Sequence, residues 1–322
     1  MPQPELSRVA TALVTGSSGF IGTHLANHLA ETPAIFGLDR CEPQRPPAYT
    51  HLTADLLHPG QLRVAAGTTG RGGVVYHLAA AAEVMTPWPD LPDLFASNVQ
   101  GTYNLLDVLQ PRLVVFASSS SVYGNADVEQ TDPLYNQVNP QCLYAASKLQ
   151  GELLLRDWVR NTGNSAIIFR FGNVVGQHCR GLIPHLAAHA MRHAGRHQPV
   201  RLRGNGSLIR DYVSVDHVVR VLAAAGHAEW KPGSLEIFNI GTGRGMTNRG
   251  VTVIVQQALA NLGFPFDATF DDPPGLGEAE KVVLHVDRTV SRFGIAPPGP
   301  AEVREVIKAA ARACFESVYA CS

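Results

Sequence analysis

Short runs of apolar and β-branched residues alternate along the first half of the chain with segments of helical periodicity. Runs of this kind suit parallel strands that are buried on both faces. They occupy residues 9–15, 34–38, 74–78, 112–116 and 166–170, and a further extended stretch precedes Asp55. Six strands alternating with helices predict a right-handed, doubly wound parallel sheet. We therefore expect an α/β fold of the Rossmann type, which binds ligands at the carboxyl ends of its strands.

The regular alternation ends after Gly172, which predicts a second, smaller α/β domain. There the pattern predicts helices at 186–196, 249–262 and 301–318, strands at 199–202, 235–240 and 282–286, and a helix that starts within 210–216. We expect residues 1–172, with 211–241 returning to them, to form the dinucleotide-binding domain. Residues 173–210 and 242–322 are expected to form a discontinuous domain that binds the substrate.

Three glycines stand between the first predicted strand and the helical pattern that follows it: Gly16, Gly19 and Gly22. In a strand–loop–helix setting, such glycines serve a tight turn, the close approach of a pyrophosphate to the backbone, and close helix–strand packing. The helix N-terminus then offers free N–H groups and a partial positive charge to the phosphates. A glycine-rich turn alone is weak support, but both flanking elements that the motif requires are predicted here.

Asp39 ends the second predicted strand, about twenty residues beyond the glycines. An acidic residue at this place hydrogen-bonds the ribose diol of NAD and repels the 2′-phosphate of NADP. Arg40 follows directly and would favour NADP, but we expect NAD. Asp55 is placed either to contact the adenine or to cap its own loop.

The segment from Phe116 to Lys148 contains the candidate chemistry. A cluster of four serines, residues 118–121, follows the fifth strand, and Tyr144 and Lys148 stand four residues apart. On a helix they share one face, where an ammonium favours the phenolate form of a neighbouring tyrosine. A tyrosine tuned in this way can act as a general base near neutral pH. The competing interpretation is an ordinary contact on a helix surface.

The composition excludes several other classes of protein. The chain is 45% hydrophobic and 16% charged, with a net charge of −1, which does not favour a nucleic-acid or membrane partner. Its five cysteines are scattered and form neither a disulfide framework nor a metal-binding pattern, so we expect a reducing cytoplasm and no metal. No apolar run reaches membrane-spanning length.

With these residues in view, the chain resembles the extended short-chain dehydrogenase/reductase family, in particular the nucleotide-sugar epimerases and dehydratases. The resemblance covers nearly the whole length and includes 15–22, 77–80, 98–102, 118–124, 144–148, 210–212 and 239–241. It implies that Tyr144 is the base, that Lys148 holds the nicotinamide ribose and lowers the Tyr144 pKa, and that Ser119 binds the substrate hydroxyl. It also implies a homodimer that packs through helices at 92–109 and 140–160.

These observations together define the expected cofactor site. We expect NAD to contact Gly16, Ser18, Gly19, Phe20, Ile21, Gly22, Asp39, Arg40, Asp55, Leu56, Leu78, Ala79, Ala80, Asn98, Ser118, Tyr144 and Lys148.

The serine cluster discriminates among the activities of the family. The 4,6-dehydratases that resemble this chain carry Asp-Glu where Ser120 and Ser121 stand here, and family decarboxylases usually keep the Glu. Residues 117–124 are instead similar to those of UDP-glucuronate and other UDP-sugar 4-epimerases. Relatives that bind UDP-sugars commonly grip the diphosphate with an Arg where this chain has Gly275. We therefore expect the substrate to contact Ser119, Ser120, Asn173, Arg180 and Arg210, with Lys281 as a further candidate, although Arg210 could instead pair with Asp211 or Asp216.

The sequence thus predicts an NAD-dependent nucleotide-sugar 4-epimerase that acts on a UDP-hexose or UDP-hexuronate through a transient 4-keto intermediate. An NAD(P)-dependent reductase, a 4,6-dehydratase and a non-catalytic NAD-binding protein remain alternatives, since a fold does not fix a function.

Overall fold

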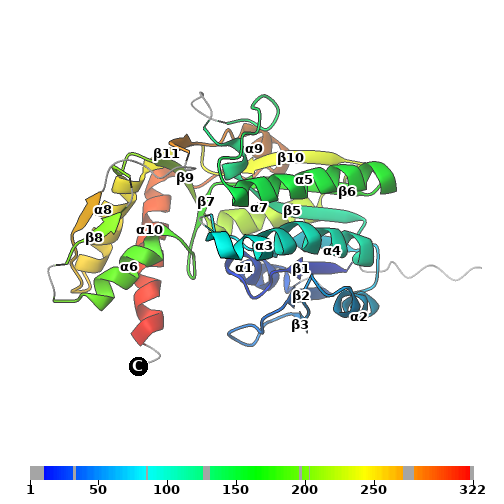
Figure 1. Ribbon diagram of the computed structural model, residues 1–322, viewed down its shortest axis with the longest axis horizontal. Helices are drawn as coiled ribbons and strands as arrows, with labels where there is room; N and C mark the ends of the chain where they lie inside the picture. The colour runs from blue at the N-terminus through cyan, green and yellow to red at the C-terminus, as the bar shows by residue number, and fades with distance from the viewer. Residues whose placement is uncertain are drawn as a thin grey trace, which may run out of the picture. The chain divides into compact units, whose positions relative to one another are not determined.

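The computed structural model describes residues 11–31, 34–84, 86–125, 131–195, 198–202, 204–270 and 279–319. Its main element is a seven-stranded sheet in the order β10-β6-β5-β4-β1-β2-β3 (Figure 1). The bounds of its strands are β1 (Ala12–Thr15), β2 (Ile35–Asp39), β3 (Thr50–Thr53), β4 (Val74–His77), β5 (Leu113–Ser119), β6 (Ser165–Phe171) and β10 (Leu235–Ile240). This confirms the α/β fold class and the six predicted strands, with the predicted strand at 235–240 joining them at the edge.

The strand order reverses at β1, which lies between β2 and β4 and pairs in parallel with both. In an open parallel sheet, such a reversal separates the loops that follow the two strands and leaves a crevice for a ligand. Every residue of β4 and of β6 is buried, which explains why these strands appear as unbroken apolar runs. The loops after β1 and β4 are therefore the expected place for a nucleotide.

Contacts along the chain divide it into two compact units. The first unit comprises residues 1–118, 147–169 and 222–236, and the second comprises 119–146, 170–221 and 237–322. The first unit holds β1 to β4 and the helices α1 (Phe20–Leu29), α2 (Pro59–Thr69), α3 (Leu91–Phe95) and α4 (Gly101–Leu109). The long helix α5 (Leu143–Thr162) lies mostly in it. Which segments bind the substrate stays a prediction.

The helix predicted at 92–109 is interrupted. A 3₁₀ turn, η1 (Trp88–Asp90), precedes α3, and a π-helical turn, η2 (Ala96–Gln100), separates α3 from α4. A π turn carries one extra residue per turn and so changes the direction in which its side chains project. The turn contains the buried residue Asn98, whose contacts are described below.

The second unit contains two small sheets. In one, β9 (Ile209–Ser214) pairs with β11 (Gly245–Thr247), β13 (Lys281–Val282) and β7 (Asn173–Val175). In the other, β8 (Val200–Leu202) pairs with β12 (Ala268–Phe270). The helices of this unit are α6 (Leu182–Arg192), α7 (Val215–His227), α8 (Asn248–Ala260), α9 (Asp287–Phe293) and α10 (Pro300–Tyr319).

Two predictions for this region are corrected, and a third is confirmed. The helix predicted to start within 210–216 begins at Val215, directly after the strand β9, which the sequence did not predict. The helix expected at 186–196 begins earlier, at Leu182, and ends at Arg192. The strand expected at 282–286 is short because its backbone binds elsewhere: the Val283 carbonyl accepts the Thr131 N–H, and the Leu284 N–H donates to the Asp211 carboxylate.

Gly22 tests how closely the first helix approaches the glycine loop. A Cβ atom at Gly22 would overlap the carbonyl oxygen of Gly16, so we expect Gly22→Ala to lower the free energy of unfolding by about 1–3 kcal/mol. Gly67 lies exposed within α2 and a Cβ atom there would meet nothing within 4 Å. Gly67→Ala is the matched control and should stabilise the protein by up to about 1 kcal/mol. Urea unfolding of both variants checks this, and equal effects would contradict it.

Candidate active site

The glycine loop joins β1 to α1. Gly16 has φ +72°, and a Cβ atom there would stand 2.8 Å from the Ala79 nitrogen, so only glycine fits. Gly19 is the N-cap residue of α1 and contributes no side-chain cap. The first turn of α1 thus presents backbone N–H groups at the positive end of the helix dipole, which is an anion-binding arrangement.

Asp39 lies beside this loop at the end of β2. One carboxylate oxygen accepts the Ser18 N–H at 3.0 Å, and the other accepts the Cys41 N–H at 3.0 Å. The Ser18 hydroxyl donates to the Cys41 carbonyl at 2.7 Å. Each carboxylate oxygen keeps a second lone pair, so the arrangement fixes Asp39 in place and still permits hydrogen bonds from a ribose diol. Arg40, the next residue, is exposed.

Asp55 shows the contact that its capping interpretation requires. Its carboxylate accepts the Leu57 N–H at 2.9 Å, which is an Asx turn. The carbonyl of the buried neighbour Leu56 accepts a hydrogen bond from Asn104 at 2.8 Å. The proposed contact of Asp55 and Leu56 with a cofactor stays a prediction.

The end of β4 is tied to the end of β1 by a buried histidine. His77 Nδ1 lies 2.9 Å from the Thr15 hydroxyl, and its Nε2 lies 2.9 Å from the Thr102 hydroxyl. The Thr15 hydroxyl also accepts the Ala79 N–H at 3.2 Å. Burial, together with the charge of Lys148, lowers the pKa of His77 to about 3, so the ring is neutral. Sequence analysis gave His77 no role of its own within the resemblance at 77–80, and its position at the end of an apolar run was the available signal.

Asn98 connects the loop after β4 to α5. Its amide oxygen accepts the Ala81 N–H at 2.8 Å, and its amide nitrogen donates to the Ala81 carbonyl at 3.0 Å and to the Ser147 hydroxyl at 2.9 Å. The residues before Ala81 in this loop are the predicted cofactor contacts Leu78, Ala79 and Ala80, all partly exposed. Asn98 is itself buried, so its position supports a structural role in shaping this loop.

The serine cluster lies at the carboxyl end of β5, which runs three residues beyond the predicted strand end. Ser118 and Ser119 are the last two residues of the strand, and a 3₁₀ turn, η3 (Ser120–Tyr123), follows. The Ser119 hydroxyl accepts the Ser121 N–H at 3.2 Å and shares a hydrogen bond of 2.7 Å with the Ser121 hydroxyl. Ser119 also hydrogen-bonds the side chain of Tyr144. Ser120 is buried.

Tyr144 and Lys148 lie one turn apart on α5. Burial raises the pKa of Tyr144 to about 12, and the hydrogen bond from Ser119 lowers it in part. Burial lowers the pKa of Lys148 to about 8, against the opposing effect of Glu152. Lys148 Nζ donates to the Ala117 carbonyl at 2.9 Å. The lowering of the Tyr144 pKa that the resemblance implied is not found in the protein alone, because desolvation of the phenolate outweighs the favourable contacts.

The residues predicted to contact the substrate differ in how far they are exposed, from the buried Ser120 to the exposed Asn173 and Arg180. Asn173 begins β7 and Arg180 lies in the loop before α6, both with exposed side chains. The Arg210 guanidinium donates to the carbonyls of Ile209 and Glu280, at 2.9 and 3.4 Å. Lys281 begins β13. Residues 274–278, which contain Gly275, lie outside the described residues.

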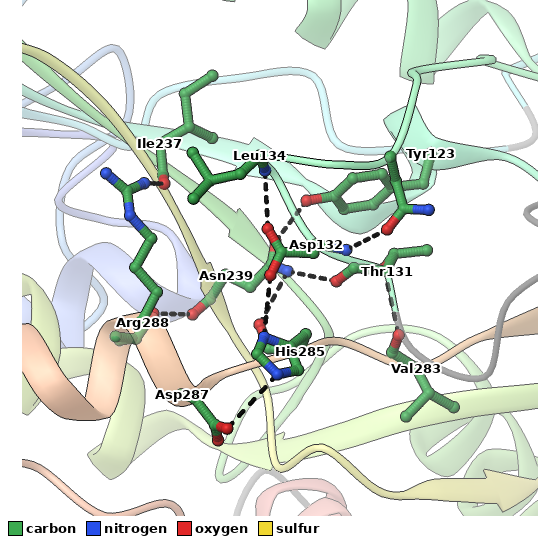
Figure 2. Close-up of polar contacts among 12 residues, drawn as sticks. Tyr123, Thr131, Asp132, Leu134, Ile237, Asn239, Val283, His285, Asp287 and Arg288 are labelled. Atoms are coloured by element: carbon green, nitrogen blue, oxygen red, sulfur yellow. Dashed lines mark hydrogen bonds and ion pairs between the residues drawn. The ribbon is translucent and has the colours of Figure 1, made fainter.

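The buried residue Asn239 connects η3, which we call the serine turn, to other segments of the second unit (Figure 2). The Tyr123 hydroxyl donates to the Asn239 side-chain oxygen at 2.7 Å. The Asn239 amide donates to the carbonyls of Thr131 and His285, at 2.8 and 3.1 Å. His285 in turn lies 3.0 Å from the Asp132 carboxylate. Sequence reasoning did not assign Tyr123 this role.

Within the described ranges, no cluster of three or more His, Cys, Asp or Glu side chains suits a metal ion. No helix among these residues combines the length and hydropathy needed to cross a bilayer.

The sequence of the chain matches a known protein family and several of its members. Residues 12–241 match the NAD dependent epimerase/dehydratase family, and the chain belongs to this family. Its relatives include a UDP-glucose 4-epimerase of Mycolicibacterium smegmatis, 31% identical over 88% of this chain and 93% of the relative. A dTDP-glucose 4,6-dehydratase of the same organism is 32% identical over 63% of this chain and 65% of the relative.

The solved structures extend the comparison to the whole fold. The UDP-glucose 4-epimerase of Thermus thermophilus, in complex with NAD, is 28% identical to this chain. It superposes with a TM-score of 0.80 over 94% of this chain and 99% of that one. The chain is therefore an enzyme of an NAD-dependent family of nucleotide-sugar epimerases and dehydratases, and its neighbours include UDP-sugar 4-epimerases.

Tyr123 tests the link between the serine turn and Asn239. Tyr123→Phe removes a buried donor and leaves the Asn239 oxygen without this partner, so we expect a loss of about 1–3 kcal/mol in the free energy of unfolding. Tyr135, whose side chain is 83% exposed, is the matched control. Tyr135→Phe should change stability by less than about 0.5 kcal/mol. Denaturant unfolding of the two variants measures the difference, and equal losses would show that the buried contact contributes nothing.

Proposed function

We propose that this protein is an NAD-dependent nucleotide-sugar 4-epimerase that acts on a UDP-hexose or UDP-hexuronate through a transient 4-keto intermediate. The single observation that carries this choice within the family is the chemistry of the serine turn. Ser120 and Ser121 stand where the related dehydratases have an acid and a carboxylate base, and neither hydroxyl can replace a carboxylate in removing a carbon-bound proton. Ser119 and Tyr144, which an epimerase needs, are hydrogen-bonded to each other.

The residues present fit NAD as the resident cofactor. A Cβ atom at Gly16 would collide with the Ala79 backbone, and α1 begins at Phe20 without a side-chain cap. Asp39 is held beside the glycine loop by the Ser18 and Cys41 N–H groups, which supports its assignment to a ribose diol and the exclusion of a 2′-phosphate. We assign the pyrophosphate to the Gly16–Gly22 loop, the adenosine ribose to Asp39, and the nicotinamide ribose to Tyr144 and Lys148. When bound, NAD would supply a reversible hydride acceptor for the C4 carbon of the sugar.

The chain itself handles the proton. The Ser119 hydroxyl orients the C4 hydroxyl of the sugar, and the Tyr144 phenolate removes its proton as the C4–H bond breaks. The same phenol returns this proton when the C4–H bond re-forms, so the cycle consumes no proton and no reductant. Lys148 contributes a positive charge one turn along α5, which favours the phenolate. The hydrogen bond from Ser119 also lowers the Tyr144 pKa, against the larger effect of burial.

The phosphates of the nucleotide sugar require a positive partner. In our proposal Arg210 supplies it, with Asn173, Arg180 and Ser120 as further contacts. The Arg210 guanidinium donates to two backbone carbonyls, which orient it, and its permanent positive charge attracts an anion. We also retain, as proposals, segments 173–210 and 242–322 as the substrate-binding part and a homodimer through the helices at 92–109 and 140–160.

A 4,6-dehydratase is the second candidate, because one of the relatives at about 30% identity has that activity. Dehydration removes the C6 hydroxyl and the C5 proton, so it leaves a different mark on the substrate than epimerisation at C4. A net reductase, the third candidate, needs a cofactor that exchanges in every turnover.

These outcomes separate when the protein is incubated in deuterated water, with no added cofactor, with UDP-glucose, UDP-N-acetylglucosamine and UDP-glucuronate. Proton NMR should show a C4 epimer of one of them without deuterium uptake. Deuterium at C5 or loss of the C6 hydroxyl would establish the dehydratase instead. Turnover only after NADH or NADPH is added to a 4-keto sugar would establish the reductase.

Tyr144 tests the assignment of the base. We expect Tyr144→Phe to lower kcat by a factor of about 10²–10⁴, because the variant cannot accept the proton of the C4 hydroxyl. NAD should remain bound, which its absorbance after denaturation of the protein would show. Tyr135→Phe, at an exposed position, should keep full activity. Unchanged kcat in Tyr144→Phe would remove Tyr144 from the mechanism.

A further inference from the structure

Glu152 is a buried carboxylate that the proposed mechanism does not use. It lies in the middle of α5 with 5% of its surface exposed, and its Oε1 accepts the Ser118 hydroxyl at 2.5 Å. Burying a carboxylate is costly unless charge or hydrogen bonds compensate. A glutamate at this place therefore calls for an explanation beyond helix propensity.

Lys148 is buried to the same extent, one helical turn before Glu152. The end of β5 contacts both side chains: the Ala117 carbonyl accepts from Lys148 Nζ at 2.9 Å, and the next residue, Ser118, donates to Glu152. The lysine precedes the glutamate along the helix, which is the less favourable order for an exposed pair. Surface stabilisation of the helix is therefore a poor explanation for this arrangement.

Among the groups named here around Lys148, only Glu152 supplies a negative charge. Burial lowers the pKa of Lys148 to about 8, and the charge of Glu152 acts in the opposite direction. His77, which faces Lys148 from β4, is neutral because burial lowers its pKa to about 3. In the protein without NAD, burial raises the pKa of Tyr144, one turn earlier on α5, to about 12, so this phenol supplies no negative charge to Lys148 there. The Phe116 ring lies 5.3 Å from Lys148 Nζ and carries no charge.

We propose that Glu152 is a positioning residue for the reaction: its buried carboxylate, anchored by Ser118, keeps the Lys148 ammonium charged at the end of β5. The use of Lys148 in catalysis rests on the proposed function, whereas the interaction between the two side chains does not. Without the carboxylate, Lys148 would lose its proton at a lower pH. The neutral amine would neither favour the Tyr144 phenolate nor offer three donors.

The chain contains only four lysines, Lys148, Lys231, Lys281 and Lys308, so their side chains can be followed individually by NMR. We would incorporate lysine labelled with carbon-13 at Cε, assign the Lys148 signal from its loss in Lys148→Arg, and titrate it from pH 6 to 11. In Glu152→Gln, which keeps the size and the hydrogen-bonding capacity of the side chain, we expect the Lys148 pKa to fall by about one pH unit or more. Asp157→Asn is the matched control, because it removes an exposed carboxylate from the same helix and should leave that pKa unchanged.

Activity gives an independent readout. Because Lys148 loses its proton at lower pH in Glu152→Gln, the alkaline limb of the kcat profile should move to lower pH by the same amount. Glu152→Asp keeps a carboxylate and should return the limb most of the way to its wild-type position. A merely structural role would lower kcat at every pH without moving the limb. If the Lys148 pKa moves but no nucleotide sugar is epimerised, the inference on Glu152 stands and the proposed function fails. An unchanged Lys148 pKa in folded Glu152→Gln overturns the inference whatever the activity.

Should Glu152→Gln not fold, the double variant Lys148→Met/Glu152→Gln decides the question. If Glu152 compensates the charge of Lys148, the double variant has no buried ammonium left to compensate. It should then fold without the carboxylate, as circular dichroism would show. Failure of both variants to fold would assign Glu152 a structural role and overturn the proposal.

Discussion

The approach of the glycine loop to the loop after β4 is the constraint on which the first unit depends. Gly16 can lie against the Ala79 nitrogen only because it lacks a Cβ atom and adopts a positive φ. The Thr15 hydroxyl joins the same two segments through His77 and the Ala79 N–H. These contacts fix the turn between β1 and α1 at the strand where the strand order reverses.

The parts of the fold and of the candidate site that could be predicted from the sequence depend on neighbours along the chain. The strands β4, β5 and β6 are buried apolar runs, and the glycine spacing together with Asp39 marks the turn that precedes α1. Tyr144 and Lys148 were found because helical spacing alone places them one turn apart. Each of these signals is contained within a few residues, so no knowledge of the tertiary structure was needed.

The features that were missed depend on distant partners. The segment after β13 is not a longer strand because its groups bind Thr131 and Asp211, which are far away in sequence. Asp211 is buried and accepts hydrogen bonds from Thr242, Gly243 and Leu284, whereas sequence reasoning had considered it only as a partner for Arg210. Burial raises the pKa of Asp211 and these donors lower it. The role of Glu152 likewise becomes visible only when Ser118 is placed against α5.

The contacts of His77 determine the direction in which each of its hydrogen bonds points. The Thr102 hydroxyl donates its proton to the Asn98 carbonyl at 2.7 Å, so it can only accept from the histidine ring. His77 therefore carries its proton on Nε2, and Nδ1 accepts from the Thr15 hydroxyl. The result is a chain of hydrogen bonds that all point in one direction, from Thr15 through His77 and Thr102 to the Asn98 carbonyl in the π turn. Reversing any one of these hydrogen bonds would require the others to reverse with it, so the imidazole is held as a single tautomer between Thr15, at the end of β1, and Thr102 in α4.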